Sequence, residues 1–500
     1  MDSSSSLTSL LQCVRRREKS LLVGFFVVFL ALNLATGSRS PTVWTDEVAY
    51  ADPAINLVES GAFTSTAWEV QRSSEHWAGN VPLYPLLLAG WIELFGMSIT
   101  AVRSLNYVLV LAGTGLLWLT ARRIDAMDRS VIRLLFVAVL LAGYGISDTY
   151  RSGRPDMIGF VLVGAGGFAG TLSSAGARHT LALLVGLLLP LSGLQFLPYA
   201  ALLCGLAFLW APGQIFPLSL AAGGGAILGG GGLASYYWYR GVWTDFLQSI
   251  TRHTAAGQSI DAKLLDLPSL LSADPSYTLL LLGALGLCGA RARRQGRWPS
   301  LSRPAVSYPL TVAVVSPIVL FVVGKYPTYY SWMGYAPLVF GICAAASTVS
   351  WSRSEALSGV GLLLLVGGIG LPARIGVSVL QWDSRSYAPV EQVVDRHITT
   401  RDTVFSSYQG YYAAKERAGA VYLPKYLWRV SDTKAKELRA VDKMVVAPDR
   451  KEVWTNRLGG QWEQMARMQA PERAIKSIFG RPLAQPYDLV VYTQSTSSPK

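Results

Sequence analysis

Long apolar runs recur along this 500-residue chain and constrain its fold more than any other feature. A helix that crosses a bilayer needs roughly 20 apolar residues, because its backbone must satisfy its own hydrogen bonds in hydrocarbon. The composition agrees, since 51% of the residues are hydrophobic and only 15% are charged. We predict an all-α polytopic membrane protein of about eleven helices, with the least certain break at 189–199. The runs lie near residues 21–37, 101–120, 131–147, 156–172, 179–194, 196–210, 215–236, 277–290, 308–324, 333–349 and 358–380.

Basic residues divide the predicted loops into two sides of the membrane. With eleven spans, five basic clusters fall on one side, which the positive-inside rule makes cytoplasmic. The net charge of +13 is then explained by loop topology and anionic lipid, and a nucleic-acid partner is not expected. The clusters are those of residues 15–19, 122–129, 178, 291–297 and 353.

Three parts follow from this topology. Residues 1–20 form a cytoplasmic tail, because no clean cleavage site follows the first run and a retained helix is favoured over a signal peptide. Residues 21–380 form the transmembrane domain, which includes an outer loop at 38–100. Residues 381–500 are more polar and contain the β-type runs DTVFSS, KMVVAP and DLVVYT, which predict a small extracytoplasmic α/β domain.

Two helices are expected inside the outer loop. Residues 46–59 predict a helix capped by Thr45 and ended by Gly61. The apolar, proline-broken stretch 81–96 predicts a helix that lies in the membrane interface. Elsewhere, GGGAILGGGG at 223–232 lacks the ending of a phosphate loop, so close helix packing through small residues explains it better.

Asp46 and Glu47 are neighbouring acids a few residues beyond the first apolar run. They could simply suit the dipole at a helix start, which needs no catalytic role. Alternatively, partial desolvation at the membrane surface makes a carboxylate a better base, and its neighbour could bind a cation or a sugar hydroxyl.

Arg154-Pro155-Asp156 opens the fourth predicted helix, on the same side as Asp46. Proline and aspartate are also ordinary helix-start residues. Arg151 and Arg154 could grip a phosphate, and an ionisable residue at the membrane edge is a candidate for function.

Lys325 ends the ninth run, beside Tyr329 and Tyr330. The lysine could snorkel beside an aromatic belt or bind a lipid phosphate. His76 and His253 fall in the outer loops without metal-ligand spacing, so each is either a ligand or an ordinary loop residue.

At this point four motifs point to a known family. They are W-T-D-E-x-x-Y at 44–50, A-x-N-x-x-x-x-G-x-F at 54–63, PLYPLLLAGW at 82–91 and R-P-D at 154–156. Over about residues 20–350 the chain resembles the C-type (GT-C) glycosyltransferases that use polyprenyl-phosphate sugars. Within them it is most similar to the branch of protein O-mannosyltransferases and aminoarabinose lipid A transferases. The resemblance does not extend to residues 381–500.

The resemblance implies a set of roles for these residues. Asp46 is the general base, Glu47 its acidic partner, and Asp156 a second acid near the acceptor. Tyr50, Tyr84 and Tyr329 are expected to bind substrate, and Arg151, Arg154 and Lys325 the donor phosphate. Some family members bind a divalent metal ion through a Glu and a His in outer loops. Here Asn80 stands where that Glu is expected, so Glu75 or His76 would have to substitute for it, and metal dependence stays open. His253 is a possible match for the loop histidine.

The resulting hypothesis is an inverting hexosyl- or pentosyltransferase in a bacterial-type inner membrane, with its site on the extracytoplasmic face. A single base opposite the leaving group implies inversion. The donor is a polyprenyl-phosphate sugar, and the acceptor a lipid, glycan or protein hydroxyl. The alternative is a transporter or flippase of lipid-linked sugars, although no internal repeat supports it. A membrane scaffold would leave the clustered acids unexplained.

Overall fold

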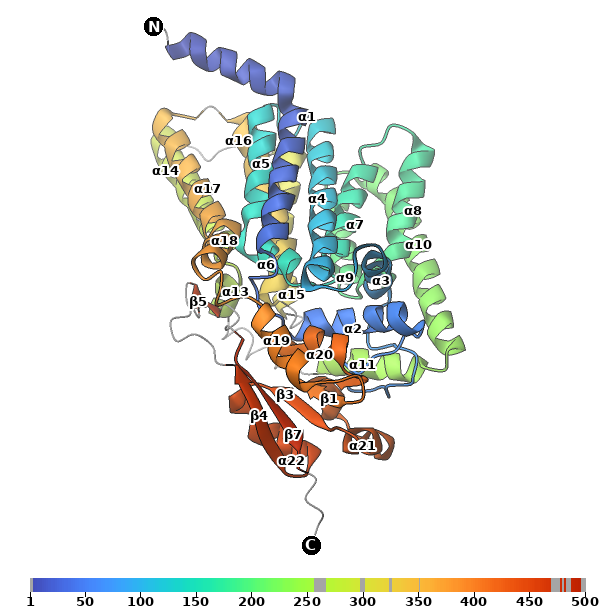
Figure 1. The fold of residues 1–500 in the computed structure, drawn as a ribbon. Helices are drawn as coiled ribbons and strands as arrows, with labels where there is room; N and C mark the ends of the chain where they lie inside the picture. Colours follow the sequence, from blue (N-terminus) through green and yellow to red (C-terminus); the bar gives the residue numbers. More distant parts are fainter. Residues whose placement is uncertain are drawn as a thin grey trace.

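In the computed structural model, helices form a bundle that stands on a small mixed α/β domain (Figure 1). The described residues are 3–255, 267–296, 302–322, 326–349, 351–468, 477–478, 481–482 and 487–495. The N-terminal end of the long first helix lies at one end of the molecule, and the C-terminal domain lies at the other (Figure 1). The protein is a multi-pass membrane protein, as its sequence predicts.

Within the described residues, five helices are long and apolar enough to cross a membrane. They are α1 (Ser3–Thr36), α4 (Ile99–Arg123), α8 (Ala175–Ser192), α10 (Pro212–Tyr239) and α15 (Pro304–Val322). Two bent pairs raise the number to seven if each pair is one span. These are α5 (Ser130–Ala142) with α6 (Tyr144–Arg151), bent by 62°, and α17 (Arg353–Gly368) with α18 (Leu371–Leu380), bent by 48°.

Four further helices complete the bundle: α7 (Asp156–Ala169), α9 (Phe196–Phe208), α14 (Pro275–Gln295) and α16 (Trp332–Thr348). Each of the apolar runs predicted from the sequence coincides with a helix or a bent pair. By length and hydropathy, however, five to seven of the described helices qualify as spans, so eleven crossings stay a prediction. The first helix starts at Ser3 and therefore includes most of the predicted tail 1–20.

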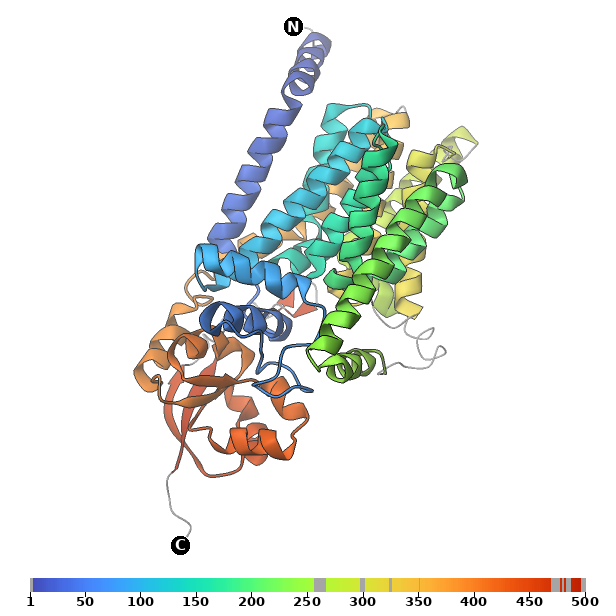
Figure 2. The ribbon, with the colours of Figure 1, turned by 90° about the vertical axis from the view of Figure 1, so that its right-hand side faces the viewer.

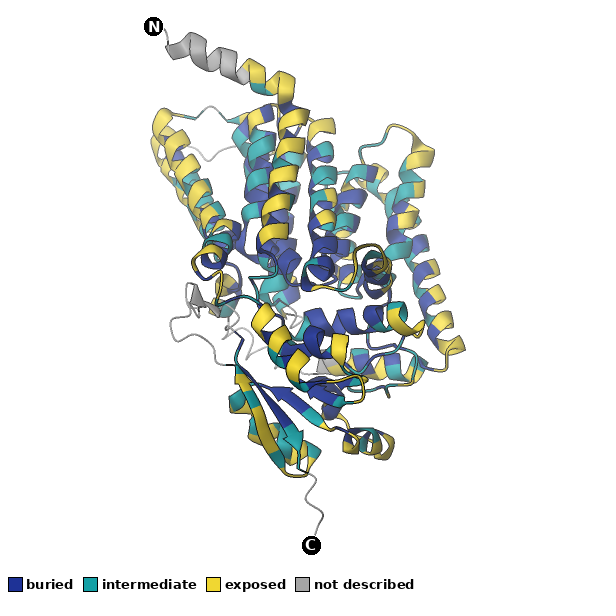
Figure 3. Ribbon diagram, viewed as in Figure 1, coloured by how far each residue is buried: buried dark blue, intermediate teal, exposed yellow. Residues whose placement is uncertain are grey.

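The glycine-rich stretch of α10 packs closely against α8. A Cβ atom on Gly225 would lie 2.1 Å from the carbonyl oxygen of Leu183, and one on Gly229 would lie 2.1 Å from that of Leu187. Only glycine permits this approach, and the prediction of close packing through small residues is confirmed. Much of the rest of α10 is exposed, as expected for lipid contact (Figure 3). Ile227, for example, is 76% exposed.

A layer of short helices separates the bundle from the C-terminal domain. Both α2 (Thr45–Ser60) and α3 (Leu83–Phe95) run across the direction of the long helices (Figure 2). The two predicted helices of the outer loop therefore exist. Gly61 ends α2 with φ 69°, as expected, but Trp44 rather than Thr45 occupies the N-cap position. The layer also contains α11 (Trp243–Ala255), α13 (Leu267–Ala273) and the 3-10 helix η1 (Thr328–Tyr330).

The C-terminal domain is built on a five-stranded mixed sheet in the order β2-β1-β3-β7-β4. β1 is parallel to β2 and β3, whereas β7 is antiparallel to β3 and β4. The three predicted runs form β1, β3 and β7, and the sequence analysis missed β2 and β4. The strands are β1 (Thr403–Ser406), β2 (Ala420–Tyr422), β3 (Lys443–Val446), β4 (Trp462–Met468) and β7 (Leu489–Gln494), with a separate pair β5 (Ser477–Ile478) and β6 (Arg481–Pro482). The helices are α19 (Ala388–His397), η2 (Tyr408–Gly410), α20 (Tyr411–Arg417), η3 (Pro424–Trp428), α21 (Asp432–Arg439), η4 (Pro448–Arg450) and α22 (Lys451–Leu458).

Hydrogen bonds join this domain to the first outer loop. The Tyr411 hydroxyl donates to Asp52 Oδ1 at 2.7 Å, and the Thr66 hydroxyl donates to the carbonyl oxygen of Val421 at 2.6 Å. The Lys415 ammonium donates to Asn56 Oδ1 at 2.7 Å. Residues more than 350 positions apart in sequence thus form one contact region.

Candidate functional site

Arg154 joins two carboxylates at the boundary between the bundle and the short-helix layer. Its Nε donates to Asp156 Oδ2 at 2.7 Å, and its Nη1 forms an ion pair with Asp46 Oδ2. Asp156 is fully buried and the Arg154 side chain is 4% exposed, whereas 30% of the Asp46 side chain is exposed. Asp46 is therefore the most exposed member of this triad.

Aromatic rings surround the Arg154 guanidinium. Its carbon atom lies 3.4 Å from the centroid of the Tyr329 ring, 5.6 Å from that of Trp44 and 5.9 Å from that of Tyr330. Stacking on these rings fixes the guanidinium plane. It leaves a cation with directed donors beside the exposed carboxylate.

Local backbone structure brings the triad together. Asp46 lies in the first turn of α2 and Asp156 in the first turn of α7. The loop between α6 and α7 turns at Gly153 with φ 64°, and the Trp44 indole N–H donates to the carbonyl oxygen of Ser152 at 2.8 Å. Asn106 of α4 donates to the carbonyl oxygen of Arg154 at 2.8 Å, which holds the loop against the bundle.

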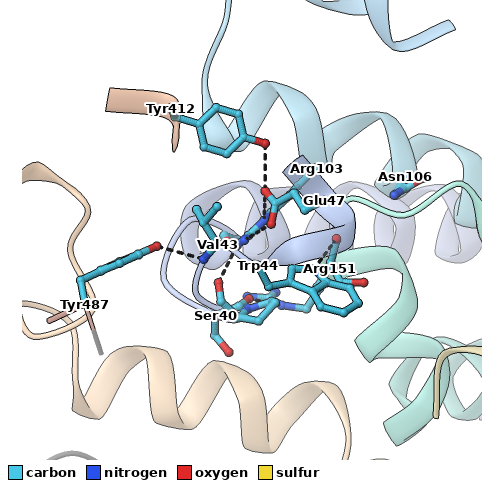
Figure 4. A network of polar contacts seen from close by, with 12 residues as sticks. Ser40, Val43, Trp44, Glu47, Arg103, Asn106, Arg151, Tyr412 and Tyr487 are labelled. Carbon is cyan, nitrogen blue, oxygen red and sulfur yellow. Dashed lines mark hydrogen bonds and ion pairs between the residues drawn. The ribbon is translucent and has the colours of Figure 1, made fainter. Parts of the chain in front are cut away.

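Glu47, the neighbour of Asp46, lies in a closed polar network with Arg103 and Tyr412 (Figure 4). Arg103 donates to it through Nε to Oε1 at 3.0 Å and through Nη2 to Oε2 at 2.6 Å, and both side chains are fully buried. Arg103 also donates to the carbonyl oxygens of Gly37 and Pro41, and the Tyr412 hydroxyl donates to Glu47 Oε1 at 3.3 Å. This geometry gives Glu47 a structural role and no access to a substrate.

Arg151 is also fully engaged and fully buried. Its guanidinium donates to Asn33 Oδ1 at 2.7 Å, to the carbonyl oxygen of Thr36 at 2.9 Å and to that of Ser40 at 3.0 Å. These bonds tie the end of α1 to the end of α6. The prediction of Arg151 as a phosphate ligand finds no support in this geometry.

Comparisons with known proteins place this geometry among known folds. No family model and no curated protein matches the sequence. Among solved structures, ArnT from Cupriavidus metallidurans bound to undecaprenyl phosphate matches with a TM-score of 0.56 at 13% identity, covering 96% of this chain and 99% of that one. The arabinofuranosyltransferase AftD from Mycobacteria matches with a TM-score of 0.51 at 14% identity, over 96% of this chain and 40% of that one. The chain has the GT-C glycosyltransferase fold. The resemblance seen in the motifs is thereby confirmed at the level of the fold.

Within this GT-C fold, Tyr50 of α2 and Tyr84 of α3 are buried, and the centroids of their rings lie 6.1 Å apart. The Tyr50 hydroxyl accepts a hydrogen bond from Asn80 at 2.8 Å, and the Tyr84 hydroxyl accepts one from Asn106 at 3.3 Å. Tyr50 lies one helical turn after Asp46 in α2, and burial, Tyr330 and Asp156 raise the pKa of Tyr50. Of the predicted site residues, Asp46, Asp156, Arg154, Tyr329 and Tyr50 therefore gather in one region.

The remaining candidates do not join this group. Lys325 and the side chain of His253 lie outside the described residues. His76 Nε2 lies 3.0 Å from the Tyr236 hydroxyl, and burial, together with Arg240, lowers the pKa of His76 to about 4. Glu75 is paired with Arg72.

The described residues do not fit the metal site of some GT-C proteins. Within the ranges given above, no group of three His, Cys, Asp or Glu side chains could hold a metal ion. Tyr50 binds Asn80, the residue that replaces the expected Glu, through a hydrogen bond that needs no metal. A divalent metal stays a prediction.

Sequence reasoning missed Arg103 as the partner of Glu47, and Trp44 as an aromatic neighbour of Arg154. One signal for Arg103 was available, because a lone arginine at the start of an apolar helix is expected to have a buried partner. No local signal pointed to Tyr412, which is 365 residues from Glu47.

Proposed function

We propose that this protein is an inverting glycosyltransferase that moves a sugar from a polyprenyl-phosphate carrier to a hydroxyl acceptor on the extracytoplasmic face. Its GT-C fold supports this proposal, as does the undecaprenyl phosphate bound to the similar ArnT. The observation that carries it is the partly exposed Asp46 carboxylate, held by the buried Arg154 at the boundary of the bundle.

Asp46 acts as the general base. The acceptor hydroxyl attacks the anomeric carbon, its proton passes to the Asp46 carboxylate, and the bond from the anomeric carbon to the phosphate oxygen breaks. Arg154 orients Asp46, and Asp156 in turn holds Arg154 through Nε. Attack opposite the leaving group inverts the anomeric configuration.

The lipid phosphate leaves as a stable anion, so it needs no strong general acid. A cation beside it stabilises the charge that grows in the transition state. Arg154, stacked on Tyr329, supplies such a cation at the site. Lys325, which precedes Tyr329 in the sequence, is a second candidate.

The direct test is sugar transfer by the purified protein with polyprenyl-phosphate sugars as donors. We expect Asp46→Asn to fold normally and to lose transfer by roughly a thousandfold, within the usual contribution of a general base. Glu59→Gln, at the exposed end of the same helix, is the matched control and should keep full transfer. Full transfer by Asp46→Asn would place the base elsewhere.

Vesicle assays separate the enzyme from the transporter. A flippase would move lipid-linked sugar across the bilayer and show no transfer to any hydroxyl acceptor. An Asp46→Asn variant that still translocates, with a wild type that never transfers, would favour that alternative.

Labelling of a cysteine placed at Glu59 by a membrane-impermeant reagent should occur from outside the cell, and labelling only from the cytosol would overturn the proposed sidedness.

A further inference from the structure

Lys425 is a largely buried lysine in η3 of the C-terminal domain. Its side chain is 5% exposed, and Nζ lies 3.9 Å from the centroid of the Trp68 ring. Among the described residues, no carboxylate or hydrogen-bond acceptor lies within bonding distance of this Nζ. An ammonium group in this largely buried position, held against an aromatic face, would be stabilised further by a nearby anion.

The surroundings of Lys425 connect it to the triad. The Trp68 indole N–H donates to the carbonyl oxygen of Ala49 in α2 at 2.9 Å, and the Trp68 ring meets the Tyr50 ring at 5.8 Å. Burial lowers the pKa of Lys425 to about 8, with Glu69 opposing and repulsion by Arg154 adding to the shift. Tyr50 lies one helical turn after Asp46, the partner of Arg154, so Trp68 and Tyr50 link Lys425 to the surroundings of the triad.

A second buried lysine in the same domain, Lys434, has hydrogen-bond partners for its ammonium group. Lys434 Nζ lies 3.8 Å from the centroid of the Tyr426 ring, much as Lys425 lies over Trp68. Unlike Lys425, it donates to the carbonyl oxygens of Glu69 at 2.7 Å and Tyr426 at 3.4 Å. Because its ammonium group already has protein acceptors, Lys434 has a structural role. It is therefore the matched control for Lys425.

We infer that Lys425 is a phosphate-binding residue that the C-terminal domain contributes to the site, where it recognises the phosphate of the lipid-linked sugar donor together with Arg154. This inference rests on the proposed function. It gives the C-terminal domain, which the resemblance does not cover, a direct part in donor recognition.

Equilibrium binding of undecaprenyl phosphate to the purified full chain tests the inference. We expect Lys425→Met to weaken binding by tenfold or more, and Lys425→Arg to keep most of the affinity. Lys434→Met should bind as the wild type does, even if its melting temperature falls. Undecaprenol, which lacks the phosphate, should bind equally to all variants, and inorganic phosphate should compete only at much higher concentration.

A pH series gives a readout that a purely structural lysine would not move. The affinity of the wild type for undecaprenyl phosphate should fall between pH 7.5 and 9, because Lys425 loses its charge in this range, and Lys425→Arg should lack this fall. Unchanged binding by a folded Lys425→Met would overturn the inference. If undecaprenyl phosphate binds through Lys425 but no sugar is ever transferred, the inference stands and the proposed function fails.

Discussion

Asp46 and Glu47 are adjacent in the chain, yet they lie in opposite environments. One residue of helix rotation, about 100°, separates their directions. Glu47 meets Arg103 in a closed network with no exposed surface, whereas Asp46 meets Arg154 with 30% of its side chain exposed. The comparison teaches that an acidic pair at a helix start can divide its tasks, with one acid fixing the loop and the other left available for chemistry.

The largest expected effect is on stability, through the buried ion pair of Glu47 and Arg103. Arg103→Met should lower the free energy of unfolding by about 3–5 kcal/mol, because it leaves the Glu47 carboxylate buried without its partner. Unfolding in mixed micelles measures this change, with Arg417→Met, which breaks the exposed pair with Asp395, as the control. The double variant Glu47→Gln/Arg103→Met should recover part of the loss. A loss no larger than that of the control would contradict the structural role of Glu47.

The next prediction concerns Arg154, the partner of the partly exposed Asp46. Arg154→Lys keeps the charge but cannot hold two carboxylates and stack on Tyr329 in the same way. We expect sugar transfer to fall about a hundredfold, which corresponds to about 2.7 kcal/mol of activation free energy, with little change in melting temperature. Steady-state kinetics should place the loss mainly in kcat. Comparable losses in stability and in transfer would show that the Glu47–Arg103 and Asp46–Arg154 pairs do not have separate roles.

The smallest effect probes the rim of the buried network. Tyr412→Phe removes one hydroxyl, whose bond to Glu47 Oε1 is 3.3 Å long, and should cost about 1 kcal/mol of stability. Sugar transfer should be unchanged in the folded variant. A transfer defect without a stability defect would draw Glu47 into the chemistry and remove the contrast with Asp46.

Sequence patterns predicted the parts of this molecule that depend on neighbouring residues. The apolar runs became helices, three β-type runs became strands, and Asp46, Arg154 and Asp156 met at one boundary because topology placed them on one side. Partners joined by folding alone were not visible. Arg103 lies 56 residues from Glu47, and Lys425 lies in a domain that matched no motif. The local pattern of W-T-D-E also could not show which acid faces inward.

The bond from Tyr412 to Glu47 has a consequence for how the protein is made. Synthesis delivers Glu47 and Arg103 early, but the hydroxyl that completes their network arrives about three hundred residues later. A nascent chain therefore carries an unfinished network around Glu47 until its last domain has folded and docked.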